Sequence, residues 1–329
     1  MAPLSPGAVM SARNLHKFLF DGLPVSGAIV RLTDAWQESL RRRGPERAFP
    51  APVRALLGEM TAAGLLMQSS IKFDGALVLQ LHGEGPVKLA VVEAKSNLSF
   101  RATATVTGPV EPGAGLRLLL NRNGNGRCAI TLDPRNRAPG VQPYQGVVPL
   151  YDDQRQPLEA LAAVLEHYML QSEQLDTRLV LAANDEVAAG LLLQRMPLTG
   201  EGNLGGGADE DQIGRNEDFN RLALLASTLS AEELLTLSPA EVLRRLFWEE
   251  PLQCFDPLPT SFACACSRER VEAMLQGLGE AEVLDILTER ETVEVGCDFC
   301  GQQFVFDAVD AGRLFTPGRD QPPSPATLQ

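Results

Sequence analysis

The sequence predicts an α+β protein with an N-terminal domain of mixed sheet and helix, a helical linker and a small C-terminal domain. Short alternating apolar runs gather in the first half of the chain with few helical stretches between them, which favours grouped strands over a doubly wound sheet. Two serine-led capping motifs mark helices after residue 229. Two close cysteine pairs lie near the C-terminus and indicate a small unit of their own.

The N-terminal domain is expected over residues 14–199, after a flexible extension over 1–13 whose start could be Met1 or Met10. Residues 27–33 alternate like a strand. Asp34 and Gln37 have the spacing of a capping box, and the helix that they begin should stop at residues 44–45, a Gly-Pro pair. A second helix is expected at about 52–68, because apolar side chains recur there at helical spacing.

From residue 71 the pattern changes to short alternating runs, with turn signals at 83–86 and 123–126 that separate hairpin-like strands. A helix is expected over 158–171, followed by strands at 177–183 and 187–196. The order of the strands does not follow from the sequence.

The linker is expected over residues 200–262, and it begins with a glycine- and acid-rich stretch that indicates a flexible joint. Ser230 precedes Glu233, and Ser238 precedes Glu241, each with capping-box spacing; Pro239 suits a first helical position. The linker ends in LFWEEPLQCFDPLPTSF (246–262), which is apolar but broken by prolines. We interpret it as a metastable segment that folds only against its neighbours.

The C-terminal domain is expected over residues 263–316, before a disordered tail over 317–329. Thirty residues separate its two cysteine pairs, CxC at Cys264 and Cys266 and CxxC at Cys297 and Cys300. Two close pairs around a short helical insert match the ligand supply of a tetrahedral Zn²⁺ site, so we expect one zinc ion per chain.

Local patterns around the cysteines support a zinc-binding fold. Ser267 should cap a helix directly after the CxC pair. Residues 293–307 alternate like a β-hairpin whose turn holds the CxxC pair and Gly301, an arrangement typical of a knuckle in which backbone amides face thiolate sulfur.

Alternatives to a zinc site are four buried cysteines that act as small hydrophobes, or a thioredoxin-like CxxC, although the βαβ setting of the latter is absent. Four thiolates would fill the tetrahedron and leave no open position for a substrate water. The metal would then be structural, or it would hold the thiolates in a reactive state. The CxC spacing favours the reactive state, because both pairs are close enough to form disulfides once metal leaves.

Composition limits the binding partners and the cellular compartment that we expect. The formal net charge is -13, the pI is about 4.8, and only four lysines occur, so nucleic acid is not an expected partner. No glycine precedes a lysine, which argues against a phosphate loop and a nucleotide. No apolar run has secretory or membrane-spanning length. We therefore expect a cytoplasmic protein with no membrane partner, in a reducing compartment where structural disulfides are rare.

The chain resembles the redox-regulated 33 kDa heat-shock chaperonin (holdase) family. The resemblance rests on the CxC and CxxC signature with its spacer and on segments along nearly the whole chain: LHKFLFDG, IKFDGALVLQLHGEGPVKLAVV, YQGVV, YMLQSEQLDTRLVLA, GLLLQRMP, EELLTL with EVLRRLFWEE, CACSRERV and CDFCG.

That resemblance implies an ATP-independent chaperone, not an enzyme, that binds unfolding proteins under oxidative stress. It implies that Cys264, Cys266, Cys297 and Cys300 ligate zinc in the reduced, inactive state. On oxidation it implies the disulfides Cys264–Cys266 and Cys297–Cys300, zinc release, linker unfolding and a homodimer.

Two cysteines lie outside that signature. Cys128 and Cys254 could be small apolar side chains, and Cys254 could also compete for disulfide pairing. Two rival functions remain open from the residues alone: an interaction protein with a purely structural zinc module, and a thiol oxidoreductase that uses Cys297 and Cys300.

Overall fold

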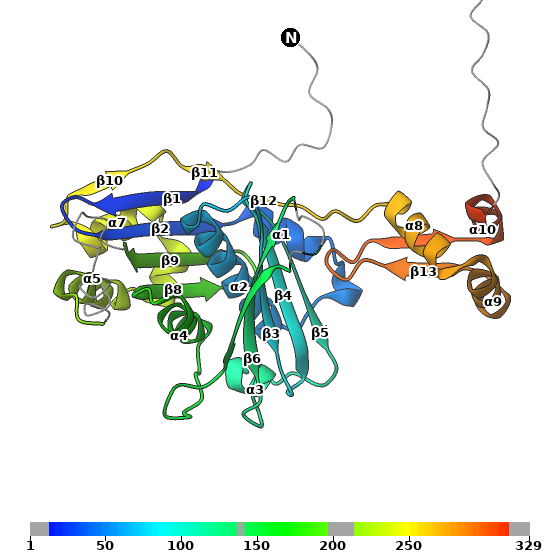
Figure 1. Ribbon diagram of the computed structural model, residues 1–329, viewed down its shortest axis with the longest axis horizontal. Helices are drawn as coiled ribbons and strands as arrows, with labels where there is room; N and C mark the ends of the chain where they lie inside the picture. Colours follow the sequence, from blue (N-terminus) through cyan, green and yellow to red (C-terminus); the bar gives the residue numbers. More distant parts are fainter. Residues whose placement is uncertain (1–12, 137–139, 141, 197–213, 316–329) are drawn as a thin grey trace, which may run out of the picture. The chain divides into compact units, whose positions relative to one another are not determined.

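The structure, a computed structural model (Figure 1), describes residues 13–136, 140, 142–196 and 214–315. The chain divides into two units, Met1–Cys264 and Ala265–Gln329. The expected N-terminal extension up to residue 12, the expected joint over 200–213 and the expected tail over 317–329 lie outside the described residues.

The strands of the first unit form two six-stranded sheets. They are β1 (Arg13–Phe20), β2 (Val25–Leu32), β3 (Gly75–His82), β4 (Val87–Lys95), β5 (Ser99–Val106), β6 (Arg127–Pro134), β7 (Tyr144–Pro149), β8 (Thr177–Ala183), β9 (Ala188–Arg195), β10 (Leu252–Cys254), β11 (Leu258–Pro259) and β12 (Ser261–Phe262). One sheet has the order β10-β1-β2-β9-β8, with β11 also pairing with β1; the other has the order β12-β5-β4-β3-β6-β7. Among these strands the described pairs are antiparallel, except that β12 is parallel to β5.

A long buried helix packs against strands of both sheets. The helices of the first unit are α1 (Asp34–Arg41), α2 (Ala51–Ser70), α3 (Leu116–Leu120), α4 (Leu161–Glu173), α5 (Glu217–Ser227), α6 (Ala231–Thr236) and α7 (Pro239–Phe247), with a 3-10 turn η1 (Pro45–Arg47). Thirteen of the twenty residues of α2 are buried, and it contacts β2 and β9 of one sheet and β3, β4 and β5 of the other. A Cβ atom at Gly58 would come within 2.4 Å of the Ala183 Cβ atom, so the glycine permits close approach of helix and sheet.

Helices α5–α7 bury a second apolar cluster against the β1-β2-β9-β8 sheet. Phe18, Phe20 and Leu191 from the strands pack with Phe219 and Phe247 from the helices, and the Phe20 and Phe247 rings meet edge to face at 5.0 Å. This face of the sheet is therefore covered by the helices that follow residue 214.

The two serine capping boxes are confirmed. The Ser230 hydroxyl accepts from the Glu233 backbone N–H, and the Ser238 hydroxyl accepts from the Glu241 backbone N–H. In each box the glutamate carboxylate accepts in turn from the backbone N–H of its serine. Pro239 occupies the first position of α7, as predicted. Each cap satisfies helix N–H groups that would otherwise lack a partner.

The second unit is small. Its elements are α8 (Arg268–Leu278), α9 (Glu280–Arg290), β13 (Val293–Gly296), β14 (Gln303–Phe306) and α10 (Ala308–Phe315). The two strands pair as an antiparallel hairpin. Six buried residues form its core: Val271, Leu275, Val283, Val293, Phe306 and Ala311.

The α+β prediction is confirmed, as is the hairpin across residues 83–86, which joins β3 to β4. Two local predictions were wrong. Thr33, not Asp34, is the N-cap of α1, and it makes no side-chain capping bond. The turn at 123–126 joins α3 to β6 rather than two paired strands, because β6 pairs with β3 and β7.

Candidate metal centre

The CxC pair leads directly into helix α8. Ser267 is the N-cap of this helix, and its hydroxyl oxygen accepts from the Arg270 backbone N–H at 3.3 Å, which confirms the sequence prediction. The cap fixes the direction in which the chain leaves Cys266. It therefore positions the CxC pair relative to the helix that follows.

The CxxC pair lies in the turn of the β13–β14 hairpin, as predicted. The Cys297 N–H donates to the Gln302 carbonyl at 2.9 Å, and the Gly301 N–H donates to the Cys297 carbonyl at 2.8 Å. Gly301 has φ +74°, a left-handed conformation that a residue with a Cβ atom rarely adopts. This glycine closes the turn and places Cys297 and Cys300 on one knuckle.

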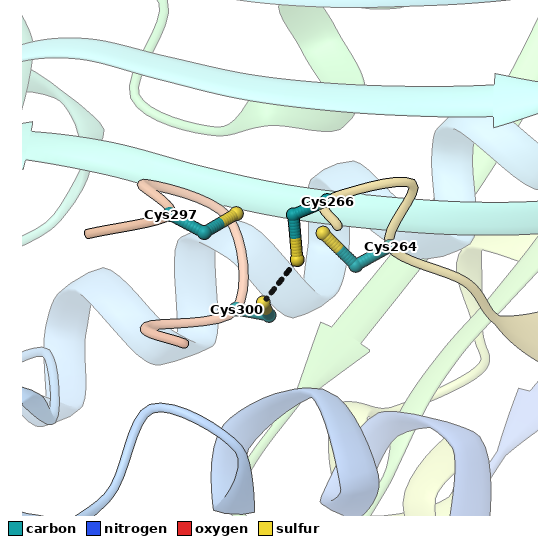
Figure 2. Close-up of side chains that lie close together, drawn as sticks. All are labelled: Cys264, Cys266, Cys297 and Cys300. Carbon is teal, nitrogen blue, oxygen red and sulfur yellow. Dashed lines mark hydrogen bonds between the residues drawn. The ribbon is translucent and has the colours of Figure 1, made fainter. Parts of the chain in front are cut away.

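The four predicted cysteines converge (Figure 2). Their sulfur atoms all lie within 4.8 Å of one another, and Cys300 is buried while the other three are partly buried: Cys264, Cys266, Cys297 and Cys300. A tetrahedral Zn²⁺ with Zn–S bonds of about 2.3 Å requires sulfur–sulfur distances of about 3.8 Å. The four-cysteine cluster thus has the size and the donor chemistry for zinc.

Arg268 links the elements next to the four-cysteine cluster. The sequence analysis did not predict this role. Its guanidinium lies 4.2 Å from the Phe306 ring centroid, donates to the Val305 carbonyl at 3.1 Å and pairs with Asp310 at 2.7 Å. It therefore ties the start of α8 to β14 and α10. The one available signal was its position, two residues after Cys266 and next to the cap.

The remaining cysteines lie outside the four-cysteine cluster. Cys128 is in β6 with no exposed surface, and burial raises the pKa of its thiol to about 12. Cys254 is exposed on β10, where it lies opposite Phe18 of β1. Cys128 therefore behaves as a small core side chain, while Cys254 is accessible to solvent.

Comparison with known proteins identifies the family. A family model described as Hsp33 protein matches residues 14–307. The chain belongs to this family. Among curated Hsp33-family relatives, the 33 kDa chaperonin of Chromobacterium violaceum is 47% identical over 301 residues, covering 92% of this chain and 93% of its own length. The 33 kDa chaperonin of Methylobacillus flagellatus is 43% identical, covering 93% and 97%.

A solved structure supports the fold. The crystal structure of the 33 kDa chaperonin (heat shock protein 33 homolog) from Thermotoga maritima aligns with a TM-score of 0.70 at 19% identity, covering 92% of this chain and 98% of that one. At this identity the likeness carries the fold alone.

Membership of the Hsp33 family supports a chaperone function, and with it the binding of client proteins. The relatives are named chaperonins, a class that is generally not enzymatic. The four-cysteine cluster could bind a metal ion, consistent with zinc. Among the described helices, none is both long enough and apolar enough to cross a bilayer.

Proposed function

We propose that this chain is a redox-regulated, ATP-independent holdase, a chaperone that binds unfolding proteins under oxidative stress without catalysing a reaction. The observation that carries the proposal is the convergence of the CxC and CxxC sulfur atoms in a member of the Hsp33 family. In the reduced state the four-cysteine cluster would hold one zinc ion as thiolates. The bound ion would cross-link the start of α8 to the hairpin turn.

Oxidation would remove the metal ligands. The disulfides Cys264–Cys266 and Cys297–Cys300 would each form by loss of two electrons from two thiolates. One hydrogen peroxide accepts these electrons as its O–O bond breaks, takes two protons from solvent, and leaves as two waters. Two peroxides would therefore convert all four thiolates, and a disulfide sulfur no longer binds zinc as a thiolate does.

The energies favour unfolding of residues 263–316, the proposed redox-switch domain. Structural zinc contributes about 10–16 kcal/mol in small peptide sites. A disulfide across about four residues returns only about 2 kcal/mol in the chain-entropy model. The six-residue core of this unit is small, and whole domains are stable by only about 5–15 kcal/mol. Loss of the thiolate ligands should therefore unfold the unit.

Unfolding would then spread into residues 200–262, the proposed linker. Its helices α5–α7 cover the apolar cluster formed by Phe18, Phe20 and Leu191 on the sheet of the proposed chaperone domain, residues 14–199. If the linker loosens, this surface becomes available to apolar segments of client proteins. Exposed apolar surface also favours the homodimer that we propose for the active state.

The cysteines and the net charge support a proposed location and the proposed absence of several partners. We propose a cytoplasmic location, because a reducing compartment would keep the four thiols reduced until an oxidant arrives. The net charge of -13 argues against nucleic acid as a partner, and we propose neither a nucleotide nor a membrane partner.

The test follows zinc, thiols and client aggregation in the same samples. Full-length reduced protein is treated with peroxide at raised temperature while a chromogenic chelator reports zinc and a thiol reagent counts cysteines. We expect about one zinc per chain to leave as four thiols disappear, and aggregation of a chemically unfolded client to stop. A Cys254→Ser variant should behave in the same way, because this residue lies outside the four-cysteine cluster.

Other outcomes would separate the alternatives. If zinc leaves but aggregation continues, the chain is better described as an interaction protein with a structural zinc module. If no zinc is present in the reduced protein, the metal assignment fails at its first step. Turnover of a disulfide substrate would favour a thiol oxidoreductase instead.

A further inference from the structure

The chain segment just before the CxC pair is paired to the edge of a sheet. Strand β12 runs parallel to the first two residues of β5, Ser99 and Phe100. The Ser261 N–H donates to the Leu98 carbonyl at 3.3 Å, and the Ala263 N–H donates to the Phe100 carbonyl at 2.9 Å. This is the evenly spaced pattern of a parallel ladder, and it ends one residue before Cys264.

Side-chain contacts also hold β12 and the residue before it against the rest of the first unit. The Phe262 ring meets the buried Phe100 ring edge to face, with centroids 6.1 Å apart, and the Arg42 guanidinium lies 5.4 Å from the Phe262 centroid. Thr260 is only 2% exposed, and its hydroxyl accepts from the Asn14 side chain at 3.4 Å. We call Leu98, Phe100 and Arg42 the Phe262 socket.

The first carbonyl acceptor of the socket lies in the tight turn between β4 and β5. Leu98, which supplies the first carbonyl acceptor, has φ +58°, a left-handed conformation that leucine rarely adopts. This conformation closes the three-residue turn, in which the Leu98 N–H donates to the Lys95 carbonyl at 2.8 Å. Here the turn is held by the Asn97 side chain, which accepts from both the N–H and the hydroxyl of Ser99.

We propose that this edge of β5 is a docking strand for unfolding client proteins, and that β12 occupies it in the resting state. The proposal rests on the proposed function and adds a second client-binding surface to the apolar cluster that α5–α7 cover. Strand addition suits such partners, because main-chain hydrogen bonds do not depend on sequence while a side-chain pocket selects a residue type. The present occupant shows which type: an extended segment with an aromatic side chain.

The position of β12 links docking to the redox state. Its ladder covers two residues, and the chain continues directly into Cys264. While the four-cysteine cluster is intact, the chain leaving β12 is fixed at that cysteine. Once oxidation unfolds the C-terminal unit, β12 keeps only its short ladder and the Phe262 contacts. An exposed aromatic segment of a client could then replace it.

The test uses a fluorescent peptide with the sequence of residues 257–263, PLPTSFA. Binding to full-length protein is measured by fluorescence anisotropy in the reduced, zinc-loaded state and after oxidation. We expect the oxidised protein to bind at least ten-fold more tightly than the reduced protein, and a chemically unfolded client to displace the peptide. Replacing the peptide's phenylalanine by alanine, or methylating its last amide nitrogen, should each weaken binding at least five-fold.

A matched pair of variants tests the socket in the protein. Arg41 and Arg42 both pair with Glu38, but the contact with Phe262 is made by Arg42. In the oxidised state Arg42→Ala should weaken peptide binding and client capture several-fold, while Arg41→Ala should match the unmodified chain. Equal binding by both variants would overturn the proposal, as would equal binding of the three peptides.

The remaining outcomes distinguish failure of the docking strand from failure of the proposed function. If oxidised protein does not suppress client aggregation, the proposed function itself fails. If it does suppress aggregation but neither the peptide nor Arg42→Ala changes client capture, only the docking strand is wrong. If the peptide dissociates an oxidised dimer and leaves client capture unchanged, the edge binds a second copy, and the assignment to clients falls.

Discussion

The sulfur atoms of Cys266 and Cys300 lie 3.3 Å apart, although 34 positions separate these residues in the sequence. This contact joins the CxC pair to the CxxC pair, whereas the proposed disulfides form within each pair. Both pairings are therefore within reach when an oxidant arrives. Which one forms decides whether oxidation releases the start of α8 from the hairpin or locks it there.

Oxidised protein should contain the disulfides within each pair. Once the C-terminal unit begins to unfold, closing a loop of about 35 residues costs about 2 kcal/mol more than closing one of about four, because loop entropy grows as (3/2)RT ln n. Trypsin can cut after Arg268 and Arg290, so mass spectrometry of a non-reduced digest separates the two pairs. A cross-linked peptide holding Cys266 and Cys300 would contradict this prediction and the unfolding that we propose.

Replacing Arg268 by alanine should weaken zinc binding. The change removes the contact with the Phe306 ring, the hydrogen bond to the Val305 carbonyl and the ion pair with Asp310. Together these are worth about 2 kcal/mol at a partly exposed site. Because zinc binding and folding are linked in small metal domains, we expect a rise of roughly ten- to thirty-fold in the zinc Kd, measured by competition with a chelator.

The control for Arg268 lies on the same helix. Arg270 is exposed on α8, so Arg270→Ala makes the same chemical change away from β14 and α10. It should leave the zinc Kd within about two-fold. Equal effects of the two variants would show that net charge near the thiolates, rather than bracing by Arg268, governs zinc affinity.

Replacing Ser238 by alanine should lower the temperature at which peroxide activates the protein. The change removes the cap of α7, a loss of about 1 kcal/mol, from a helix that buries Val242 and Leu246 in the cluster on the first sheet. Ser227→Ala is the control, because Ser227 is exposed and bonds within α5 to the Ala223 carbonyl. If both variants activate at the same temperature as the original chain, stability of α7 does not set the threshold.

Local signals in the sequence were sufficient where a few neighbouring residues decide the structure. The capping box at Ser238 and the knuckle glycine Gly301 each satisfy hydrogen bonds within three to five positions, so their spacing alone predicts them. The four-cysteine cluster was predictable for the same reason, since each pair is local. That the two pairs meet was an inference from the chemistry of zinc, because the fold that joins them is not local.

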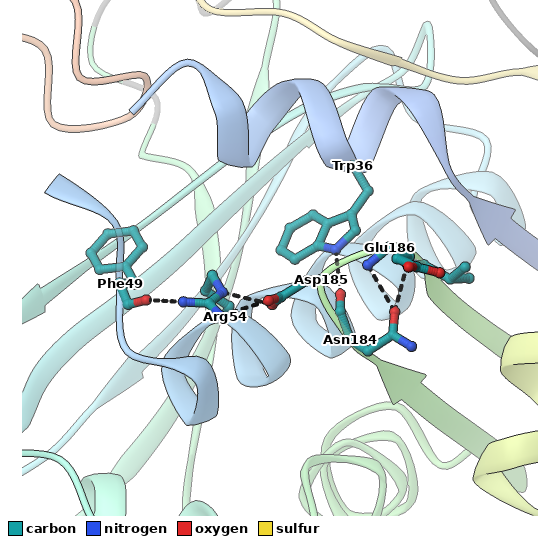
Figure 3. Close-up of polar contacts among 7 residues, drawn as sticks. Trp36, Phe49, Arg54, Asn184, Asp185 and Glu186 are labelled. Carbon is teal, nitrogen blue, oxygen red and sulfur yellow. Dashed lines mark hydrogen bonds and ion pairs between the residues drawn. The ribbon is translucent and has the colours of Figure 1, made fainter. Parts of the chain in front are cut away.

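Tertiary contacts overrode the local signal at Asp34 and Gln37. Instead of capping α1, the Gln37 amide donates to the Glu186 carbonyl in the turn between β8 and β9. The same turn accepts a bond from the Trp36 indole at the Asn184 carbonyl, and its Asp185 pairs with Arg54 of α2 (Figure 3). A turn 149 positions away thus competes for this side chain, and no local pattern reveals it.

The sequence did not predict strands β10–β12, because these strands also depend on contacts with distant parts of the chain. Three prolines interrupt residues 251–259, which argues against strands by local propensity. Each strand is only two or three residues long, and each forms because an edge of β1 or β5 supplies hydrogen-bond partners. From its composition, residues 246–262 were predicted to fold only against neighbouring elements. The composition did not show that β1 and β5 are those neighbours.

Replacing Glu59 by glutamine should stabilise the protein at high pH. Glu59 lies on α2 beside a cavity of about 490 Å³ lined largely by apolar side chains such as Leu56 and Leu161. Burial raises the pKa of its carboxyl from 4.5 to about 7. Between these values the folded state holds a proton that the unfolded state has lost, so stability falls as the pH rises toward 7.

The size of that effect follows from the pKa. At about 1.4 kcal/mol per pKa unit, ionised Glu59 costs at most roughly 3 kcal/mol above pH 7. Glutamine stays neutral, so we expect Glu59→Gln to raise the free energy of unfolding by about 1–3 kcal/mol at pH 8 and to change it little at pH 4. Denaturant unfolding of the reduced protein at both pH values measures the difference.

Glu159 supplies the control for Glu59. It lines the same cavity but is exposed, and it pairs with Arg117 at 3.3 Å. Glu159→Gln removes an exposed ion pair worth at most about 1 kcal/mol, so it should be neutral or slightly destabilising at pH 8. A stabilisation by Glu59→Gln that is the same at pH 4 and pH 8 would show that its gain comes from packing, not from the buried charge.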